Sequence, residues 1–267
     1  MKLTHTKPTS ISFYTASPTS PASIDDDAGI QQSSHAVLSD ESLISTLSSH
    51  DAVIVACYSV DPLVHELAAL SASPFHSAQR RAAGRSTLVV QGIFEASITT
   101  ALSLLQLTPA RKSTSKEDDH DGNAQKWGIV TTGAFWQDHL TKGVADFLGV
   151  EVMHPSTTDG SFRLQNKRFA GVHTTGLNAG DFHKGVSKEV TEQRLKHTTK
   201  VCLKAKNTRV IIMGCAGMAG LEGIIREAAK EELGEDFAYG ELHVVDAVRA
   251  ALMQVEQTVK LQRLLRR

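Results

Sequence analysis

The sequence predicts an α/β fold in which parallel strands alternate with helices. Three observations predict it: short apolar runs recur along the chain, each leads into small or polar residues, and an amphipathic helical pattern follows each run. Runs of this length that are apolar throughout are typical of parallel strands covered by helices on both faces. The expected arrangement is two similar lobes, each a mostly parallel sheet flanked by helices.

Four segments of the chain carry this strand-then-helix pattern. The apolar runs are Ala52–Ala56, Leu88–Ile93, Trp127–Val130 and Val210–Gly214. The helices after them are expected to end near Leu70, Leu105, Leu148 and Leu233. A further helix is expected over about 246–263, because apolar residues recur there at helical spacing. Those residues are Val248, Leu252, Val255 and Val259.

The segments outside these units are rich in small, polar or charged residues. Before the first unit, the alternation over 11–14 predicts a short strand. An exposed loop is expected over 19–35, and a helix over about 39–49. Residues 71–87 and 108–125 are interpreted as surface insertions, the second of which marks the passage between the two lobes.

Composition and charge exclude several classes of function. Hydrophobic residues make up 41% of the chain and charged residues 21%, which is ordinary for a globular protein. A formal net charge of −1 gives no general footprint for nucleic acid or an anionic membrane. Three cysteines, an odd number at wide spacing, argue against a disulfide framework. We therefore expect a cytoplasmic protein without a nucleic-acid or membrane partner, and the sequence leaves a homo-oligomer open.

The sequence carries none of the motifs that would indicate a cofactor, a metal or a nucleophilic serine. No glycine-rich nucleotide-binding loop follows a strand. No Cys and His residues cluster at the spacing of a zinc site, and no GxSxG motif is present. We therefore expect a site that uses neither cofactor nor metal and takes a small-molecule substrate.

Two cysteines occupy equivalent positions in two of the strand-then-helix units. Cys57 and Cys215 each follow an apolar strand and precede a helix. Ligands of parallel α/β sheets bind at this edge, outside the carboxyl ends of the strands. A helix N-terminus favours a thiolate, so each cysteine is predicted to serve as a base near neutral pH. Cys202 lies within a predicted helix and is interpreted as a packing residue.

Five segments in the same order resemble the aspartate/glutamate/hydantoin racemase superfamily, and within it the hydantoin and allantoin racemase branch, including its fungal members. They are VIVACYSVDPLV (53–64), GIFEAS (92–97), WGIVTTGAFW (127–136), TTGLNAGDFH (174–183) and VIIMGCAGMAGL (210–221). The resemblance covers most of residues 11–258. The blocks around the two cysteines are specific for the superfamily and much less specific for the substrate.

The resemblance implies a cofactor-independent racemase with its active site in the cleft between the two lobes. One cysteine thiolate removes the α-proton of the substrate, and the other cysteine, as the thiol, protonates the opposite face. Carried onto this chain, the pair is Cys57 and Cys215. The residues implied to line the pocket are Ser59, Thr131, Thr132, Ala216, Gly217 and Met218.

One feature of the superfamily is expected to be absent from this sequence, either because the sequence is truncated or because the protein has lost part of its site. Its members open with a strand that ends in an Asn-Pro-Asn-Ser-like loop, whose Asn contacts the substrate. This chain reaches the equivalent of the second strand by Phe13.

The lobe division implied is 1–107 with 243–267 for the lobe carrying Cys57, and 108–242 for the lobe carrying Cys215.

Three functions stay open from the sequence. The first is racemisation of a hydantoin-type compound, either allantoin or a 5-substituted hydantoin. The second is racemisation of an acidic amino acid, or a related isomerase or decarboxylase reaction in the same pocket. The third is a binding role for a family member whose catalysis is impaired by the missing strand. The mainly neutral residues at the strand ends favour a hydantoin ring.

Overall fold

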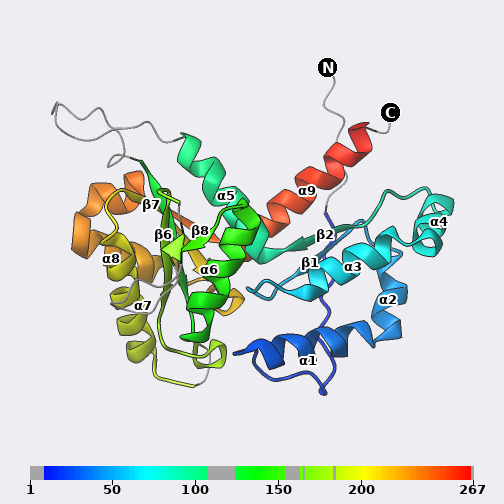
Figure 1. Cartoon of the computed structure of the whole chain (residues 1–267), viewed down its shortest axis with the longest axis horizontal. Coiled ribbons are helices and arrows are strands. Elements are labelled where there is room, and N and C mark those ends of the chain that lie inside the picture. Colours follow the sequence, from blue (N-terminus) through cyan, green and yellow to red (C-terminus); the bar gives the residue numbers. More distant parts are fainter. Residues whose placement is uncertain (1–8, 108–123, 154–162, 165, 183–184, 266–267) are drawn as a thin grey trace.

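The computed structural model describes residues 9–107, 124–153, 163–164, 166–182 and 185–265. Two parallel sheets flanked by helices confirm the predicted α/β class (Figure 1). One sheet has the order β1-β2, with strands Ala52–Val55 and Val89–Gly92. The other has the order β6-β3-β7-β8, with strands Phe169–Thr174, Lys126–Thr131, Thr208–Gly214 and His243–Asp246. A short antiparallel pair joins β4 (Val152–Met153) to β5 (Arg163–Leu164).

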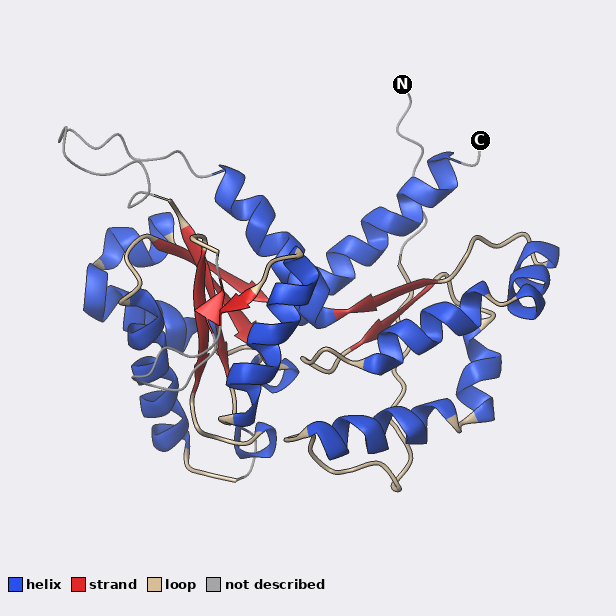
Figure 2. Ribbon diagram, in the orientation of Figure 1, coloured by secondary structure: helices blue, strands red, loops and turns tan. Residues whose placement is uncertain are grey.

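Helices surround both sheets (Figure 2). Those near the two-stranded sheet are α1 (Asp27–Leu38), α2 (Glu41–Leu47), α3 (Pro62–Ala72) and α4 (Pro74–Ala82). The others are α5 (Ile93–Leu107), α6 (Phe135–Leu148), α7 (Lys188–Leu203), α8 (Glu222–Leu233) and α9 (Ala247–Leu265). Single-turn segments are η1 (Ala179–Phe182), η2 (Ala216–Met218) and η3 (Phe237–Glu241).

The four-stranded sheet has an apolar core on each face, because successive side chains of a strand point to opposite sides. On β7, Ile212 contributes to the core with α5, α6 and α9, while Ile211 and Met213 contribute to the core with α7 and α8. All three side chains are at most 1% exposed. Burial of each one stabilises the fold by about 1.5–3 kcal/mol relative to exposure.

Two sequence predictions in the first 40 residues are wrong, and a third segment contains a helix that was not predicted. Residues 19–35 do not form a loop throughout, because α1 begins at Asp27. Asp26 caps it by accepting from the Gly29 N–H at 2.7 Å. Residues 71–87, interpreted as an insertion, contain α4, whose first residue follows the capping side chain of Ser73.

The strand predicted over 11–14 does not form either. This segment is held by side-chain hydrogen bonds and not by pairing with a strand. Ser12 bonds to the ring of His50 at 2.8 Å, and Tyr14 donates to Asp40 at 2.8 Å. The side chain of Phe13 is 94% exposed. Alternation alone cannot stabilise a strand that no neighbouring strand pairs with.

The last helix, predicted over about 246–263, forms as α9. It packs against α5, β1 and β2, and also against β7 and β8. The strand β8, which the implied lobe division places with Cys57, pairs with β7 in the four-stranded sheet. We propose that the returning segment of the first lobe begins at Ala247. The other boundary, at 107/108, adjoins residues outside the described part of the chain.

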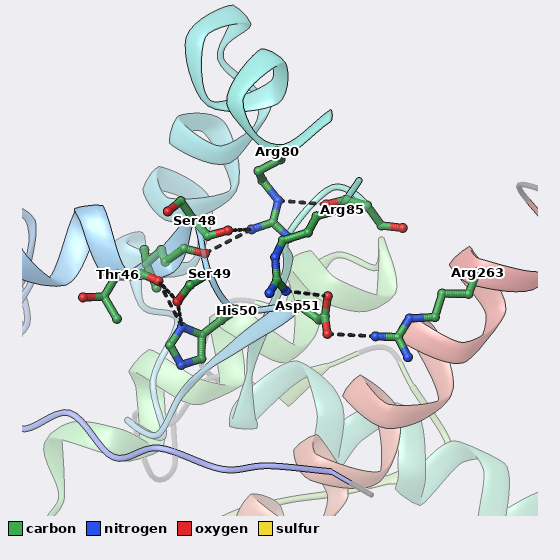
Figure 3. A network of polar contacts seen from close by, with 10 residues as sticks. Thr46, Ser48, Ser49, His50, Asp51, Arg80, Arg85 and Arg263 are labelled. Atoms are coloured by element: carbon green, nitrogen blue, oxygen red, sulfur yellow. Dashed lines mark hydrogen bonds and ion pairs between the residues drawn. The ribbon is translucent and has the colours of Figure 1, made fainter. Parts of the chain in front are cut away.

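A polar network joins the start of β1 to α2, α4 and α9 (Figure 3). Asp51 accepts from Arg85 at 3.2 Å and from Arg263 of α9 at 2.8 Å. Arg80 of α4 is 3% exposed and donates to the carbonyl of Leu47 at 3.0 Å. The guanidinium therefore satisfies a carbonyl at the end of α2, which the helix itself cannot satisfy. The network attaches the C-terminal helix to the two-stranded sheet.

No helix among the described residues is both long and apolar enough to cross a membrane.

Cys202 is fully buried where α7 meets the four-stranded sheet, in agreement with its interpretation as a packing residue. A Cβ placed on Gly128 of β3 would lie 2.6 Å from the Cys202 sulfur. We expect Gly128→Ala to lower the free energy of unfolding by about 1–3 kcal/mol through overpacking. Urea unfolding of the purified variant measures this change.

Removing the sulfur should relieve the clash. Gly128→Ala/Cys202→Ala should therefore be less destabilised than the sum of the two single variants, as expected for side chains in contact. Additive losses would show that the sulfur is not what limits space at Gly128.

Candidate active site

The fold brings together the two cysteines that follow β1 and β7. Cys57 lies two residues after the end of β1, and Cys215 directly follows β7 in the other sheet. Both are free thiols and partly buried. Charge on Cys215 raises the pKa of Cys57, so the two side chains are electrostatically coupled across the two sheets. Two partly buried thiols from separate sheets therefore lie within electrostatic range of each other.

The Cys57 thiol sits beside a hydroxyl and a carboxylate. Ser59 donates to the Cys57 sulfur at 3.2 Å, and the same hydroxyl lies 3.4 Å from Oδ2 of Asp61. Burial raises the pKa of Cys57 to about 12. The Ser59 hydrogen bond opposes this rise, whereas the charge of Asp61 adds to it. Cys57 is therefore held as the neutral thiol in the unliganded protein.

The Cys215 thiol sits at the start of the single turn η2. Burial raises its pKa, and the backbone N–H groups of Gly217 and Met218 oppose the rise, while the Met218 N–H also donates to the Cys215 carbonyl at 3.0 Å. A smaller increase comes from the charge of Asp25, in the loop before α1. Backbone donors of this kind stabilise a thiolate without any basic side chain.

These surroundings correct the expectation that helix N-termini lower both pKa values. Asp61 caps α3 and so places its own negative charge between that helix and Cys57. Cys215 is followed by η2, whereas α8 begins only at Glu222. In both places burial outweighs the favourable effect of the backbone dipoles.

The threonines predicted at the end of β3 hold neighbouring strand ends together. Thr131 donates its hydroxyl to the carbonyl of Gly214 at 2.5 Å, directly before Cys215. The carbonyls of Thr131 and Thr132 accept from the N–H groups of Thr175 and Gly176, at 2.9 and 3.1 Å. Thr131 and Thr132 are 1% and 2% exposed. Their bonds fix the backbone around Cys215.

Several residues implied to line the pocket are buried. The Met218 side chain is fully buried in the core beneath α7 and α8, because it packs there as part of η2. Ser59 is 2% exposed and bonded to Cys57. Ala216 and Gly217 keep partial exposure. Ser59 thus bonds to one of the two thiols, and the role of these residues in lining a substrate pocket stays a prediction.

Sequence reasoning missed two carboxylates that act on the thiols, those of Asp25 and Asp61, and a third, that of Glu95, which is within electrostatic range of Asp61. Asp25 and Glu95 each have one buried carboxylate oxygen for which no hydrogen-bond partner is found among the described residues. Burial raises the pKa of Glu95, and the charge of Asp61 contributes to this rise. The Asp61-Pro62 pair carries a helix N-cap signal that could have indicated Asp61. The position of Asp25 depends on a contact between distant segments that no local motif marks.

Within the described part of the chain, no three His, Cys, Asp or Glu side chains cluster in a way that could hold a metal ion.

A family model described as Asp/Glu/hydantoin racemase matches residues 2–255. Among solved structures, the chain is similar to the allantoin racemase of Klebsiella pneumoniae, with 16% identity, a TM-score of 0.54, and coverage of 90% of this chain and 71% of that one. It is also similar to the allantoin racemase of Pseudomonas fluorescens, with 19% identity, a TM-score of 0.52, and coverage of 90% and 74%. These structural similarities show the fold. No curated protein sequence matches the chain.

The distance between the two sulfurs remains a prediction. We expect roughly 7–9 Å, which leaves room for one carbon centre between two contacts of ~3–3.5 Å. A bifunctional thiol reagent with ends about 8 Å apart should join Cys57 to Cys215 within one chain, as peptide mass spectrometry would detect. Cys57→Ser is the control and should abolish the cross-link. A product that joins only separate chains would show that the sulfurs do not face each other.

Proposed function

Since the chain belongs to the Asp/Glu/hydantoin racemase family, we propose that it racemises hydantoin-type compounds without a cofactor. The substrates proposed are allantoin or a 5-substituted hydantoin. Cys57 and Cys215 are proposed as the two groups that exchange protons with opposite faces of the substrate. The observation that supports this most directly is the electrostatic coupling of two free thiols that come from different sheets.

The proposed reaction needs only proton transfers. In a hydantoin ring, the α-carbon lies between a carbonyl and a ring nitrogen. One thiolate accepts the α-proton, and the electron pair of the broken C–H bond moves onto the carbonyl oxygen as an enolate. The other thiol then gives its proton to the opposite face of the same carbon, and the carbonyl re-forms. After one turnover the two sulfurs have exchanged protonation states.

The charges around the thiols favour a neutral ring over an acidic amino acid. Among the described residues, the charged side chains that act on the two thiols are the carboxylates Asp61 and Asp25. An amino acid would bring its own carboxylate close to them, where like charges repel in a partly buried site. A hydantoin or ureido group instead offers N–H donors, for which Asp25 has a buried oxygen with no described partner.

A racemisation assay tests the proposal. Single enantiomers of allantoin and of a 5-monosubstituted hydantoin should lose optical activity faster with the protein than in buffer alone. L-Aspartate and L-glutamate should keep theirs, because the site repels their carboxylates. Polarimetry or circular dichroism measures both results. Racemisation of L-aspartate or L-glutamate at a higher rate than that of allantoin or the hydantoin would contradict the proposed substrate. If none of the four compounds loses optical activity faster than in buffer, a binding role is favoured.

The two-cysteine mechanism predicts a directional effect of substitution. Cys57→Ser and Cys215→Ser should each abolish net racemisation, because serine is a far weaker base than a cysteine thiolate. Each variant should still exchange the α-proton of one enantiomer with deuterium from D₂O, since the remaining thiolate can remove and return a proton on its own face. The two variants should prefer opposite enantiomers, as measured by NMR.

The double variant should lose little beyond the single ones, because the two groups act as a unit. Wild-type racemisation by Cys57→Ser would show that Cys57 is structural.

A further inference from the structure

A chain of buried polar groups connects α1 to Cys57. Ser34 of α1 donates to Oδ1 of Asp61 at 3.0 Å, and the N–H of Leu63 donates to the same oxygen at 3.0 Å. Ser59 lies between the second carboxylate oxygen and the Cys57 sulfur, at 3.4 and 3.2 Å. Ser34, Ser59 and Asp61 are at most 4% exposed. The carboxylate is therefore fixed in place by donors on one oxygen, while its other oxygen faces Ser59.

The Ser59 hydroxyl has one proton and two acceptors within reach. When Cys57 is a thiol, the hydroxyl can donate to Oδ2 of Asp61 and accept from the S–H group. When Cys57 is a thiolate, the hydroxyl can turn its proton toward the sulfur. The thiol arrangement satisfies the buried carboxylate, whereas the thiolate arrangement takes that donor away from it and places two negative charges close together. Asp61 thus favours the thiol form of Cys57, and it does so against the hydrogen bond from Ser59, which favours the thiolate.

The surroundings of Cys215 have the opposite tendency. The backbone N–H groups of Gly217 and Met218 favour the thiolate of Cys215, and the Met218 N–H is shared with the Cys215 carbonyl, to which it donates at 3.0 Å. Donors on the backbone are fixed by η2 and cannot turn away, unlike the Ser59 hydroxyl. The two thiols proposed to share one substrate are therefore held by unlike groups.

Resting on the proposed function, we propose that Asp61 is a positioning residue that acts on Cys57 both directly and through Ser59. It holds Cys57 as the proton donor in the resting enzyme and leaves Cys215 to act first as the base. The first proton of a resting enzyme is then removed from the substrate face that Cys215 contacts. The enantiomer with its α-proton on that face reacts without a prior proton exchange.

Several other titratable groups face this arrangement. The charge of Cys215 acts on Cys57, and the charge of Asp25 acts on Cys215. Asp61 is within electrostatic range of His139 on α6 and of Glu95 on α5. Burial lowers the pKa of His139, against the opposing effect of its ion pair with Asp27 at 3.4 Å. A test must therefore measure each thiol separately and change only the groups in the chain from Asp61 to Cys57.

Alkylation of the full chain by iodoacetamide, without substrate, provides such a test. Peptide mass spectrometry gives the rate at each cysteine as a function of pH. In the wild type, Cys215 should react at lower pH than Cys57. At pH values below the pKa of Cys57, Asp61→Asn should raise the rate of alkylation at Cys57 on the order of tenfold. This increase corresponds to a Cys57 pKa that is lower by one unit. Ser59→Ala should lower the Cys57 rate, because it removes the only side-chain donor to that sulfur among the described residues.

Asp40→Asn is the matched control. Asp40 caps α2 as Asp61 caps α3, and asparagine is an equally good cap, so a general effect of cap substitution would appear in both variants. The Asp40 variant should leave both alkylation rates unchanged. The Cys215 rate should stay within about twofold in all three variants, and thermal unfolding should confirm that each is folded.

The inference is overturned if Asp61→Asn leaves the Cys57 rate unchanged or lowers it, or if Cys57 reacts before Cys215 in the wild type. If Asp61→Asn does not fold, Ser59→Ala provides the test. An alkylation rate at Cys57 that stays constant or increases in Ser59→Ala would then overturn the inference. Alkylation requires no turnover, so the two proposals fail separately. The expected rates without racemisation would reject the proposed function alone, and racemisation with the wrong rates would reject only the role of Asp61.

Discussion

The apolar layer between the two sheets decides where one thiol lies relative to the other. Helix α5 begins directly after β2, yet it packs on β3, β7 and β8 of the other sheet. On α6, Gly143 has no side chain, which lets that helix approach Val60, in the loop after Cys57, and Phe94 of α5. The loop that carries Cys57 is thus packed against helices of the four-stranded sheet. Every property of the candidate site depends on this close packing.

The same packing creates a conflict between burial and ionisation. A thiol must lose its proton to act as a base, but burial in an apolar layer favours the neutral form. The protein responds differently at its two cysteines. Cys215 has backbone N–H groups that favour the charged form, while Cys57 lies beside Asp61, which favours the neutral form against the opposing hydrogen bond from Ser59. An unequal pair suits a reaction in which one sulfur accepts a proton and the other supplies one.

The carboxylates near the thiols, and not the fold, bear on which substrate the site accepts. Membership of the Asp/Glu/hydantoin racemase family establishes the class of reaction, and the family name itself spans charged amino acids and neutral rings. The choice between these substrates depends on local charge. Asp25 and Asp61 supply negative charge beside the thiols, and both lie on segments that belong to no strand. Loops and helix caps can therefore change specificity while the parallel sheets stay the same.

The sequence by itself determined the α/β class, the four strand-then-helix units, the last helix and the two candidate cysteines. Continuous apolar runs such as Val210–Gly214 are local signals, and so is a cysteine at a strand end. The helices α1 and α4 were missed because each buries few large apolar residues; α1 buries Ile30 and Val37, with Ser34 between them. Only the tertiary structure decided that Asp61 and Ser59 surround Cys57 and that Asp25 reaches Cys215. Side chains far apart in sequence become neighbours through packing, and no local pattern records which of them will meet.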